Sequence, residues 1–201
     1  FVLVSKGSYQ HELNITYPFS LVAFKAEQEP IHIIPAYWFL FNMFAIARNN
    51  YKFKKRDKRV QKVQHIETDP LAPDAMQEVL VALDRLILLT RDYLKKISEQ
   101  NVLSARTEQE ELQAAKDYLH QNTEADFTLF DLQAQKKYGA TIFKPVKAYK
   151  EYRKILKYFA ARSIIEYCKS NGYEKFSREV LEKIEKISLF TEWTNAGGQI
   201  I

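Results

Sequence analysis

The sequence predicts an α+β fold that is mostly helical, in which a small N-terminal β-sheet is followed by a bundle of about five helices. Strand-like alternation of apolar and polar residues and short apolar runs fall within residues 1–34, whereas later segments repeat apolar residues at helical spacing. The 201 residues are 46% hydrophobic and contain only 5 Gly and 6 Pro, so one core burying roughly 70% of the unfolded surface is possible. We therefore expect a β region over 1–34, continuing a preceding domain, and a helical domain over 35–201.

The β region divides into four short segments. Residues 1–4 have strand character, and in residues 12–17 Leu13, Ile15 and Tyr17 alternate with polar residues at the period of a half-buried strand. Residues 19–24 and 31–34 are apolar runs separated by a polar loop, a pattern that predicts a hairpin.

The first two predicted helices both contain long apolar stretches. Pro35 suits a first helical turn because it lacks the N–H that would have no partner there, so a helix is expected over about residues 35–58. A second helix over residues 74–100, capped by Asp74, is apolar on almost every side in its middle. Such a helix usually lies at the centre of a bundle.

Three further helices follow from their end signals. Thr107 and Glu110 fit a capping box that opens a third helix. Pro145 begins a long helix that ends at the pair Asn171-Gly172, and Ser177 caps the last one. Residues 126–139 fit either a strand with a turn or a short helix. Residues 193–201 are expected to be irregular or extended, ending like the start of a strand of a longer chain.

A basic segment after an aromatic run is the strongest candidate for a functional site. Residues 52–62 contain seven Lys or Arg and one Asp, a local charge of +6 against +5 for the whole chain. On a helix most of these cations share one stripe. Guanidinium and ammonium groups bind phosphate or carboxylate, and an amide can hydrogen-bond a sugar hydroxyl. The segment therefore predicts an anion-binding site made of Arg48, Asn49, Lys52, Arg56 and Arg59.

Other interpretations of this segment stay open. Cations near a helix C-terminus interact favourably with the macrodipole, so the charge run also suits an ordinary solvated helix end. Nucleic acid is not expected, because one basic patch without a binding motif is a small footprint. The apolar run over residues 33–47 is interrupted at Pro35 and Asn42 and is shorter than the roughly 20 residues that span a bilayer. We expect no membrane span there, but a buried helix.

No metal, cofactor or catalytic centre is predicted. Four histidines lie too far apart in sequence to form a metal-type pair: His11, His32, His65 and His120. Acid–base roles for His11 beside Glu12, or for His65 near other acids, depend on the fold bringing a substrate close. Cys168 is placed like a small buried hydrophobe. A single cysteine and the lack of a secretory signal favour a cytoplasmic location.

Three stretches of sequence carry a resemblance to a protein family. They are SKGSYQHELNITYPFSLV at residues 5–22, PAYWFLFNMFAIARNN at 35–50 and RDKR at 56–59. These stretches resemble an uncharacterised family of long bacterial proteins in which a left-handed parallel β-helix of hexapeptide repeats precedes a helical C-terminal region. The resemblance implies that this chain is that C-terminal region, with its first strands next to the last β-helix coils.

The functional prediction is an accessory module of a larger bacterial protein that binds a phosphorylated sugar or sugar nucleotide through the basic helix. One alternative is a structural module without a ligand, whose aromatic helix packs on the β-helix or on a second protomer. Another is part of a transferase completed by the β-helix, because other hexapeptide β-helix proteins include acyltransferases and sugar nucleotidyltransferases, often trimeric. Whether the chain is an enzyme stays open.

Overall fold

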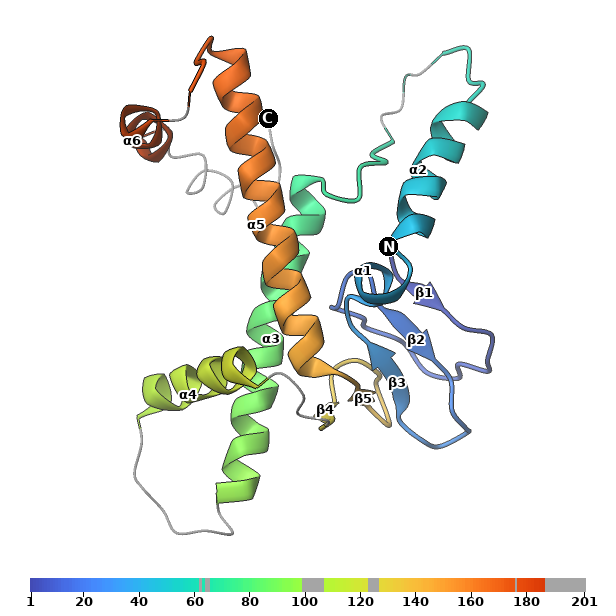
Figure 1. Cartoon of the computed structure of the whole chain (residues 1–201). Coiled ribbons are helices and arrows are strands. Elements are labelled where there is room, and N and C mark those ends of the chain that lie inside the picture. The colour runs from blue at the N-terminus through green and yellow to red at the C-terminus, as the bar shows by residue number, and fades with distance from the viewer. Residues whose placement is uncertain (62, 64–65, 99–106, 123–126, 176, 187–201) are drawn as a thin grey trace.

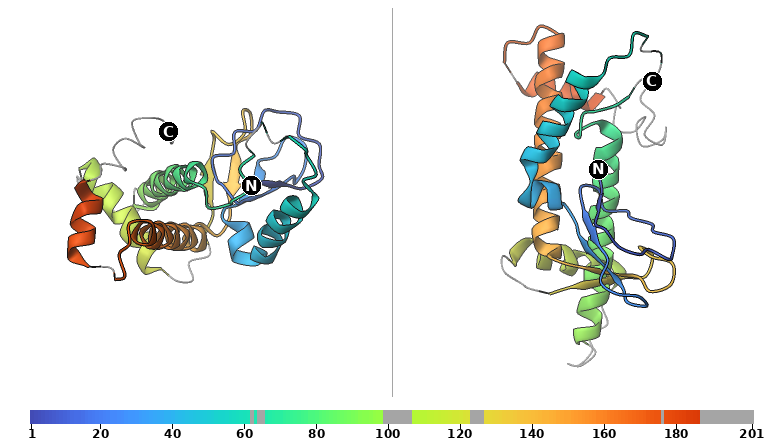
Figure 2. Two further views of the ribbon diagram at one scale, coloured as in Figure 1. Left: turned by 90° about the horizontal axis from the view of Figure 1, so that it is seen from above. Right: turned by 90° about the vertical axis from the view of Figure 1, so that its right-hand side faces the viewer.

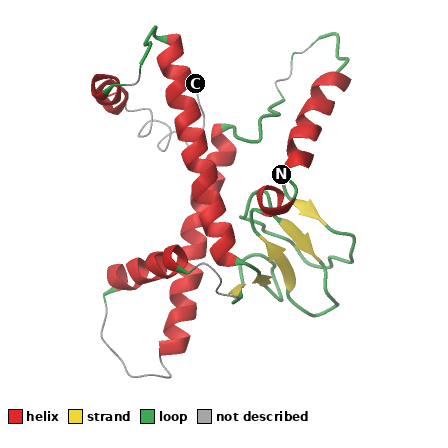
Figure 3. Ribbon diagram, in the orientation of Figure 1, coloured by secondary structure: helices red, strands yellow, loops and turns green. Residues whose placement is uncertain are grey.

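The computed structural model describes the chain except residues 62, 64–65, 99–106, 123–126, 176 and 187–201. It confirms the predicted fold class, because a small mixed sheet lies beside a larger set of helices (Figures 1 and 3). The tail over 193–201, and the strand-like end predicted within it, lie outside the described residues.

The sheet has five strands in the order β1-β2-β3-β5-β4. β1 pairs with β2 and β3 with β5 in parallel, whereas β2 with β3 and β4 with β5 are antiparallel. The strands are β1 (Leu3–Val4), β2 (Leu21–Ala23), β3 (Ile31–Ile34), β4 (Leu129–Asp131) and β5 (Ala140–Ile142). The predicted N-terminal hairpin is confirmed as β2 and β3. The sheet also takes two strands from residues beyond 35, so residues 1–34 supply only part of it.

One edge strand of this sheet, β1, lies where strand character was predicted, and one other predicted strand does not form. Residues 126–139, which fitted either a strand or a helix, contain β4 and a turn in their described part. The strand predicted over 12–17 does not form, and Leu13 makes only an isolated bridge with Gln135. Its alternating apolar side chains nevertheless pack on the core, with Tyr17 fully buried. The alternation of apolar and polar residues therefore predicted correctly which side chains are buried, but not the backbone pairing, because the segment forms no strand.

The helices pack mainly as one long pair with shorter helices around it. α3 (Pro73–Ser98) and α5 (Pro145–Ser170) lie side by side, as Figure 2 shows from above, and α4 (Glu108–Gln121) packs against both. α1 (Tyr37–Phe41) follows β3 and packs against α5, and α2 (Met43–Arg56) packs mainly on α1. α6 (Arg178–Lys186) follows the end of α5. As a result α2 extends away from the long pair (Figure 1).

Most helix ends form where their signals lie. The capping box is complete, since Thr107 accepts from the backbone N–H of Glu110 and the Glu110 side chain accepts from that of Thr107. Pro145 occupies the start of α5, and Gly172, with φ +72°, follows its end. Ser177 Oγ accepts from Val180 N at 3.4 Å, as its predicted cap role requires. The predicted cap at Asp74 is wrong, because α3 already begins at Pro73 and Asp74 lies in its first turn.

The helix predicted over about 35–58 is two helices separated at Asn42. This residue has φ −150° and ψ 42°, which ends α1 and starts α2 in a new direction. The buried helix predicted over 33–47 is therefore correct only in part. Trp38, Phe39 and Leu40 pack on the core, whereas Phe44 beyond the break is 76% exposed. An all-round apolar run gives no information about which of its sides meets the core.

One hydrophobic core joins the sheet to the long helices. It contains side chains from β2, β3 and β5 together with Met76, Val79 and Leu86 of α3 and Tyr149 and Tyr152 of α5. The middle of α3 is less enclosed than predicted, since Val81 is 52% exposed. The sheet and the α3–α5 pair therefore share one core, and α1 and α2 lie at its side.

Candidate anion-binding site

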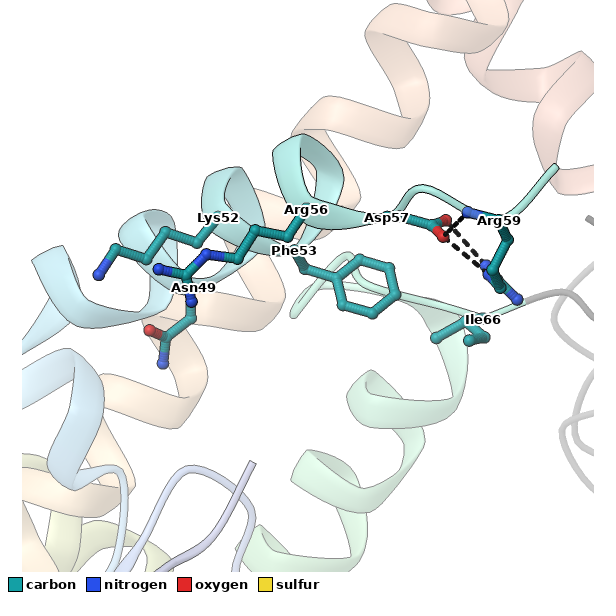
Figure 4. Close-up of a pocket in the computed structure, with 7 residues that line it drawn as sticks. All are labelled: Asn49, Lys52, Phe53, Arg56, Asp57, Arg59 and Ile66. Atoms are coloured by element: carbon teal, nitrogen blue, oxygen red, sulfur yellow. Dashed lines mark hydrogen bonds and ion pairs between the residues drawn. The ribbon is translucent and has the colours of Figure 1, made fainter.

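Four of the five residues predicted to bind an anion line one open pocket at the end of α2. The pocket has a volume of about 500 Å³ and is formed by α2, the turn after it and one residue of the following loop. Its lining residues are Asn49, Lys52, Phe53, Arg56, Asp57, Arg59 and Ile66 (Figure 4). Anion binding stays a prediction, but four of the five residues predicted for it lie around the same pocket.

The pocket combines a polar part and an apolar part. Asn49, Lys52 and Arg56 are spaced three and four residues apart, so successive helical turns place them on one face. Figure 4 shows the Arg56 side chain running back along α2 towards Asn49, while Phe53 points towards Ile66. A ligand in this pocket would therefore meet cationic and amide groups at one end and an apolar surface at the other.

The charged groups of the pocket are only partly neutralised. Arg59 forms a two-pronged ion pair with Asp57, with Nε–Oδ1 at 2.8 Å and Nη2–Oδ2 at 2.9 Å. This hydrogen bonding raises the pKa of the Arg59 guanidinium above its ordinary value. Within the described residues no acidic side chain forms an ion pair with Lys52 or Arg56. The charged lining residues therefore carry a net charge of +2.

The same cations also have a structural role at the helix end. Lys54, Lys55 and Arg56 occupy the last turn of α2, where the macrodipole and unpaired carbonyls favour positive charge. Arg48, the fifth predicted residue, is exposed and is not part of the pocket lining. On the helix Arg48 and Lys55 lie next to Lys52, at the edge of the predicted stripe that is farther from Asn49 and Phe53.

A buried polar cluster elsewhere in the fold was not predicted. The carboxylate of Asp131, only 1% exposed, accepts from the Tyr17 hydroxyl at 2.6 Å and from Arg85 Nε at 3.2 Å. Arg85 Nη2 donates to the second carboxylate oxygen, which also accepts from Gln133 N at 2.9 Å. The cluster ties β4 to α3 and to the segment before β2. One clue was available, since Arg85 lies within the most apolar stretch of its helix.

These contacts determine the ionisation of the cluster. Burial opposes ionisation of Asp131, but hydrogen bonds from Arg85 and Tyr17 outweigh it and lower the pKa of the carboxyl. Burial and the adjacent carboxylate raise the pKa of the Tyr17 phenol well above its ordinary value. Asp131 is therefore ionised and Tyr17 neutral at pH 7. Every oxygen of the carboxylate is occupied by a protein donor, which suits a structural role.

The histidines do not form a site in the described part of the chain. His11 packs against Tyr138, His32 against Phe143 and His120 against Tyr149, with ring centroids 5.4, 4.8 and 6.5 Å apart. His65 lies outside the described residues. No group of His, Cys, Asp or Glu side chains in the described regions could hold a metal ion. Cys168 is buried, as predicted.

Among the helices that the structure describes, none is long and apolar enough to cross a membrane. No family model matches the chain, and no solved structure matches it. The chain is similar to an uncharacterised protein from Treponema pallidum, with 29% identity over 209 aligned positions that cover all of this chain and 26% of that protein. The chain thus spans about a quarter of the length of this relative, and the β-helix resemblance stays a prediction.

Proposed function

We propose that this chain is an accessory module of a larger bacterial protein and that it binds an anionic small molecule, a phosphorylated sugar or sugar nucleotide, in the pocket at the end of α2. The observation that carries the proposal is the convergence of Lys52, Arg56 and Asn49 on one pocket wall beside Phe53. Lys52 and Arg56 have no ion-pair partner among the described residues, so a bound phosphate would supply the missing countercharge.

Each lining group has a distinct part in this proposal. Arg56 presents the planar fork that matches two phosphate oxygens, and Lys52 adds a mobile point charge. Asn49 can hydrogen-bond a sugar hydroxyl, and Phe53, 38% exposed, offers a surface for a sugar or base. Arg59 is held by Asp57 at the other end of the pocket, near Ile66 (Figure 4), where the ion pair carries no net charge. The macrodipole opposes anion binding at this helix end, so the side-chain cations must outweigh it.

Isothermal titration tests the proposal with three probes: inorganic phosphate, glucose 6-phosphate and uridine diphosphate glucose. We expect binding of at least one organic phosphate, and a Kd about 10- to 100-fold weaker in Arg56→Ala, the usual cost of losing one charge-assisted hydrogen bond. Lys55→Ala is the matched control, because Lys55 has the same charge on the same turn but lies outside the pocket lining. Equal weakening by both variants, or no binding by the unaltered protein, would reject the pocket.

The alternative of a module that only oligomerises has a different signature. It predicts that none of the three probes changes the melting temperature, whereas analytical ultracentrifugation finds an oligomer. The transferase alternative requires residues from another part of the protein, and its test is turnover of uridine diphosphate glucose by the full-length protein but not by an Arg56→Ala variant.

A further inference from the structure

The side of α2 that faces away from the pocket exposes several apolar side chains. At 3.6 residues per turn, Met43, Phe44, Ala47 and Tyr51 share one face of the helix, here called the outer face of α2. Met43 is 61% exposed, Phe44 76% and Tyr51 65%. Since an aromatic side chain buries about 150–250 Å², this face leaves on the order of 400 Å² of apolar surface in water. A patch of that size is comparable to the largest apolar patch of a typical monomer, which often has a function.

Cations border this apolar face along one edge and at its C-terminal end. Arg48 and Lys55 lie on the edge, each four residues after an aromatic residue of the face, and Lys54, seven residues after Ala47, lies on the face itself beyond Tyr51. All three are exposed. α2 contains no acidic residue, and none of these three cations forms an ion pair with a described residue. The outer face is therefore an apolar strip with a positive edge and a positive C-terminal end.

The pocket lies on a different side of the same helix. Ala45 and Ile46, the buried residues of α2, share the inward side with Asn49 and Phe53. The outer face points away from them, on a helix that stands apart from the long pair (Figure 1). A ligand in the pocket would therefore leave the outer face uncovered.

We propose that the outer face of α2 docks onto an anionic lipid surface, with Phe44, Met43 and Tyr51 entering the headgroup region and Arg48, Lys54 and Lys55 contacting phosphates. Helices that lie in a bilayer interface combine an apolar strip with flanking cations in this way. Long cationic side chains can follow the strip inward and still keep their charge at the headgroups. This attachment is peripheral and needs no spanning segment.

Charge favours a lipid surface over other occupants. Two copies of this face would bring Arg48, Lys54 and Lys55 towards their own counterparts, with no acid on either α2 to compensate. A protein partner would need carboxylates along one edge and at the C-terminal end of an apolar ridge. An anionic bilayer supplies negative charge on every side of an inserted strip, and it fits a convex helix without a groove.

Co-sedimentation with vesicles tests this proposal. We expect the protein to bind vesicles of phosphatidylglycerol and phosphatidylcholine, to bind pure phosphatidylcholine weakly, and to be released progressively by salt. The double variant Phe44→Ser/Tyr51→Ser should weaken binding at least tenfold. Replacing each of Arg48, Lys54 and Lys55 by Gln should weaken it about fivefold per residue.

Matched variants separate this surface from general stickiness and from the pocket. Leu132→Ser/Tyr158→Ser removes two comparably exposed apolar side chains elsewhere and should bind vesicles like the unaltered protein. Lys52→Ala/Arg56→Ala, which disables the pocket, should also bind. Circular dichroism melts confirm that each variant is folded.

Three outcomes would overturn the proposal. One is equal binding by the unaltered protein and Phe44→Ser/Tyr51→Ser. Another is loss of vesicle binding only in Lys52→Ala/Arg56→Ala, which would place the lipid headgroup in the pocket. The third is a dimer in ultracentrifugation that Phe44→Ser/Tyr51→Ser dissociates while vesicles bind neither protein, which would assign the face to a second copy of the chain.

Discussion

Replacing Arg85 by Leu should destabilise the fold strongly, because it leaves a buried carboxylate without its countercharge. Asp131 is 1% exposed and loses both contacts from the guanidinium. Breaking a buried pair by removing one partner costs about 3–5 kcal/mol. Asp131 keeps its hydrogen bonds from Tyr17 and Gln133 N, so we expect the lower end, about 3 kcal/mol or roughly a hundredfold in the unfolding equilibrium constant.

The loss should depend on pH in a defined direction. In the unaltered protein the pKa of Asp131 is lowered, so its contribution to stability is present above the ordinary carboxyl pKa and is lost as pH falls through the lowered value. In Arg85→Leu burial dominates and raises the pKa of Asp131. The penalty then applies at pH 7 and is relieved as pH falls through the raised pKa. The difference between the two proteins should therefore shrink on acidification.

Urea denaturation followed by circular dichroism at pH 7 and at a mildly acid pH measures this difference. With an m value of about 2 kcal/mol/M, the midpoint at pH 7 should fall by about 1.5 M. Arg91→Leu is the control on the same helix, since Arg91 pairs with exposed Asp92 and Glu108 and should contribute no more than about 1 kcal/mol. Equal losses from both variants, or a loss at pH 7 that persists in acid, would refute this account of Asp131.

Three further substitutions test other parts of the fold by the same denaturation assay. Tyr152→Phe removes a fully buried hydroxyl that bridges two backbone groups and should cost about 2 kcal/mol, whereas exposed Tyr158→Phe should be neutral. Thr107→Ala removes the capping box of α4 and should cost about 1 kcal/mol. Gly139→Ala should cost more than Gly172→Ala: both have positive φ, but only at Gly139 would the added methyl meet neighbouring backbone, 2.9 Å away. Equal losses at the two glycines would contradict the last expectation.

Local signals predicted most of the helix ends, but not the break between α1 and α2. The capping box at Thr107 and the stop at Gly172 depend on a few neighbouring residues, so the sequence contains the whole interaction. The exposure of Phe44 depends on the break at Asn42, which changes the direction of the chain and turns one side of an apolar run outward. Helical periodicity cannot predict that change of direction.

The candidate site shows the same division. Spacing on one helix was enough to group Asn49, Lys52 and Arg56. It could not assign Asp57 to Arg59, because their pairing depends on the turn after α2. The partner of Arg85 could not be predicted from local spacing at all, because Asp131 lies 46 residues away in sequence.

The sheet order has a consequence for synthesis on the ribosome. β3 lies between β2 and β5, and its pairing with β5 joins Ile33 to Ile142, roughly a hundred residues further along the chain. Until that second segment has left the exit tunnel, a nascent chain would carry β3 with an open backbone edge, which other chains can join. The sheet therefore cannot be completed until Ala140–Ile142 has emerged, and the edge of β3 is open to other chains during that interval.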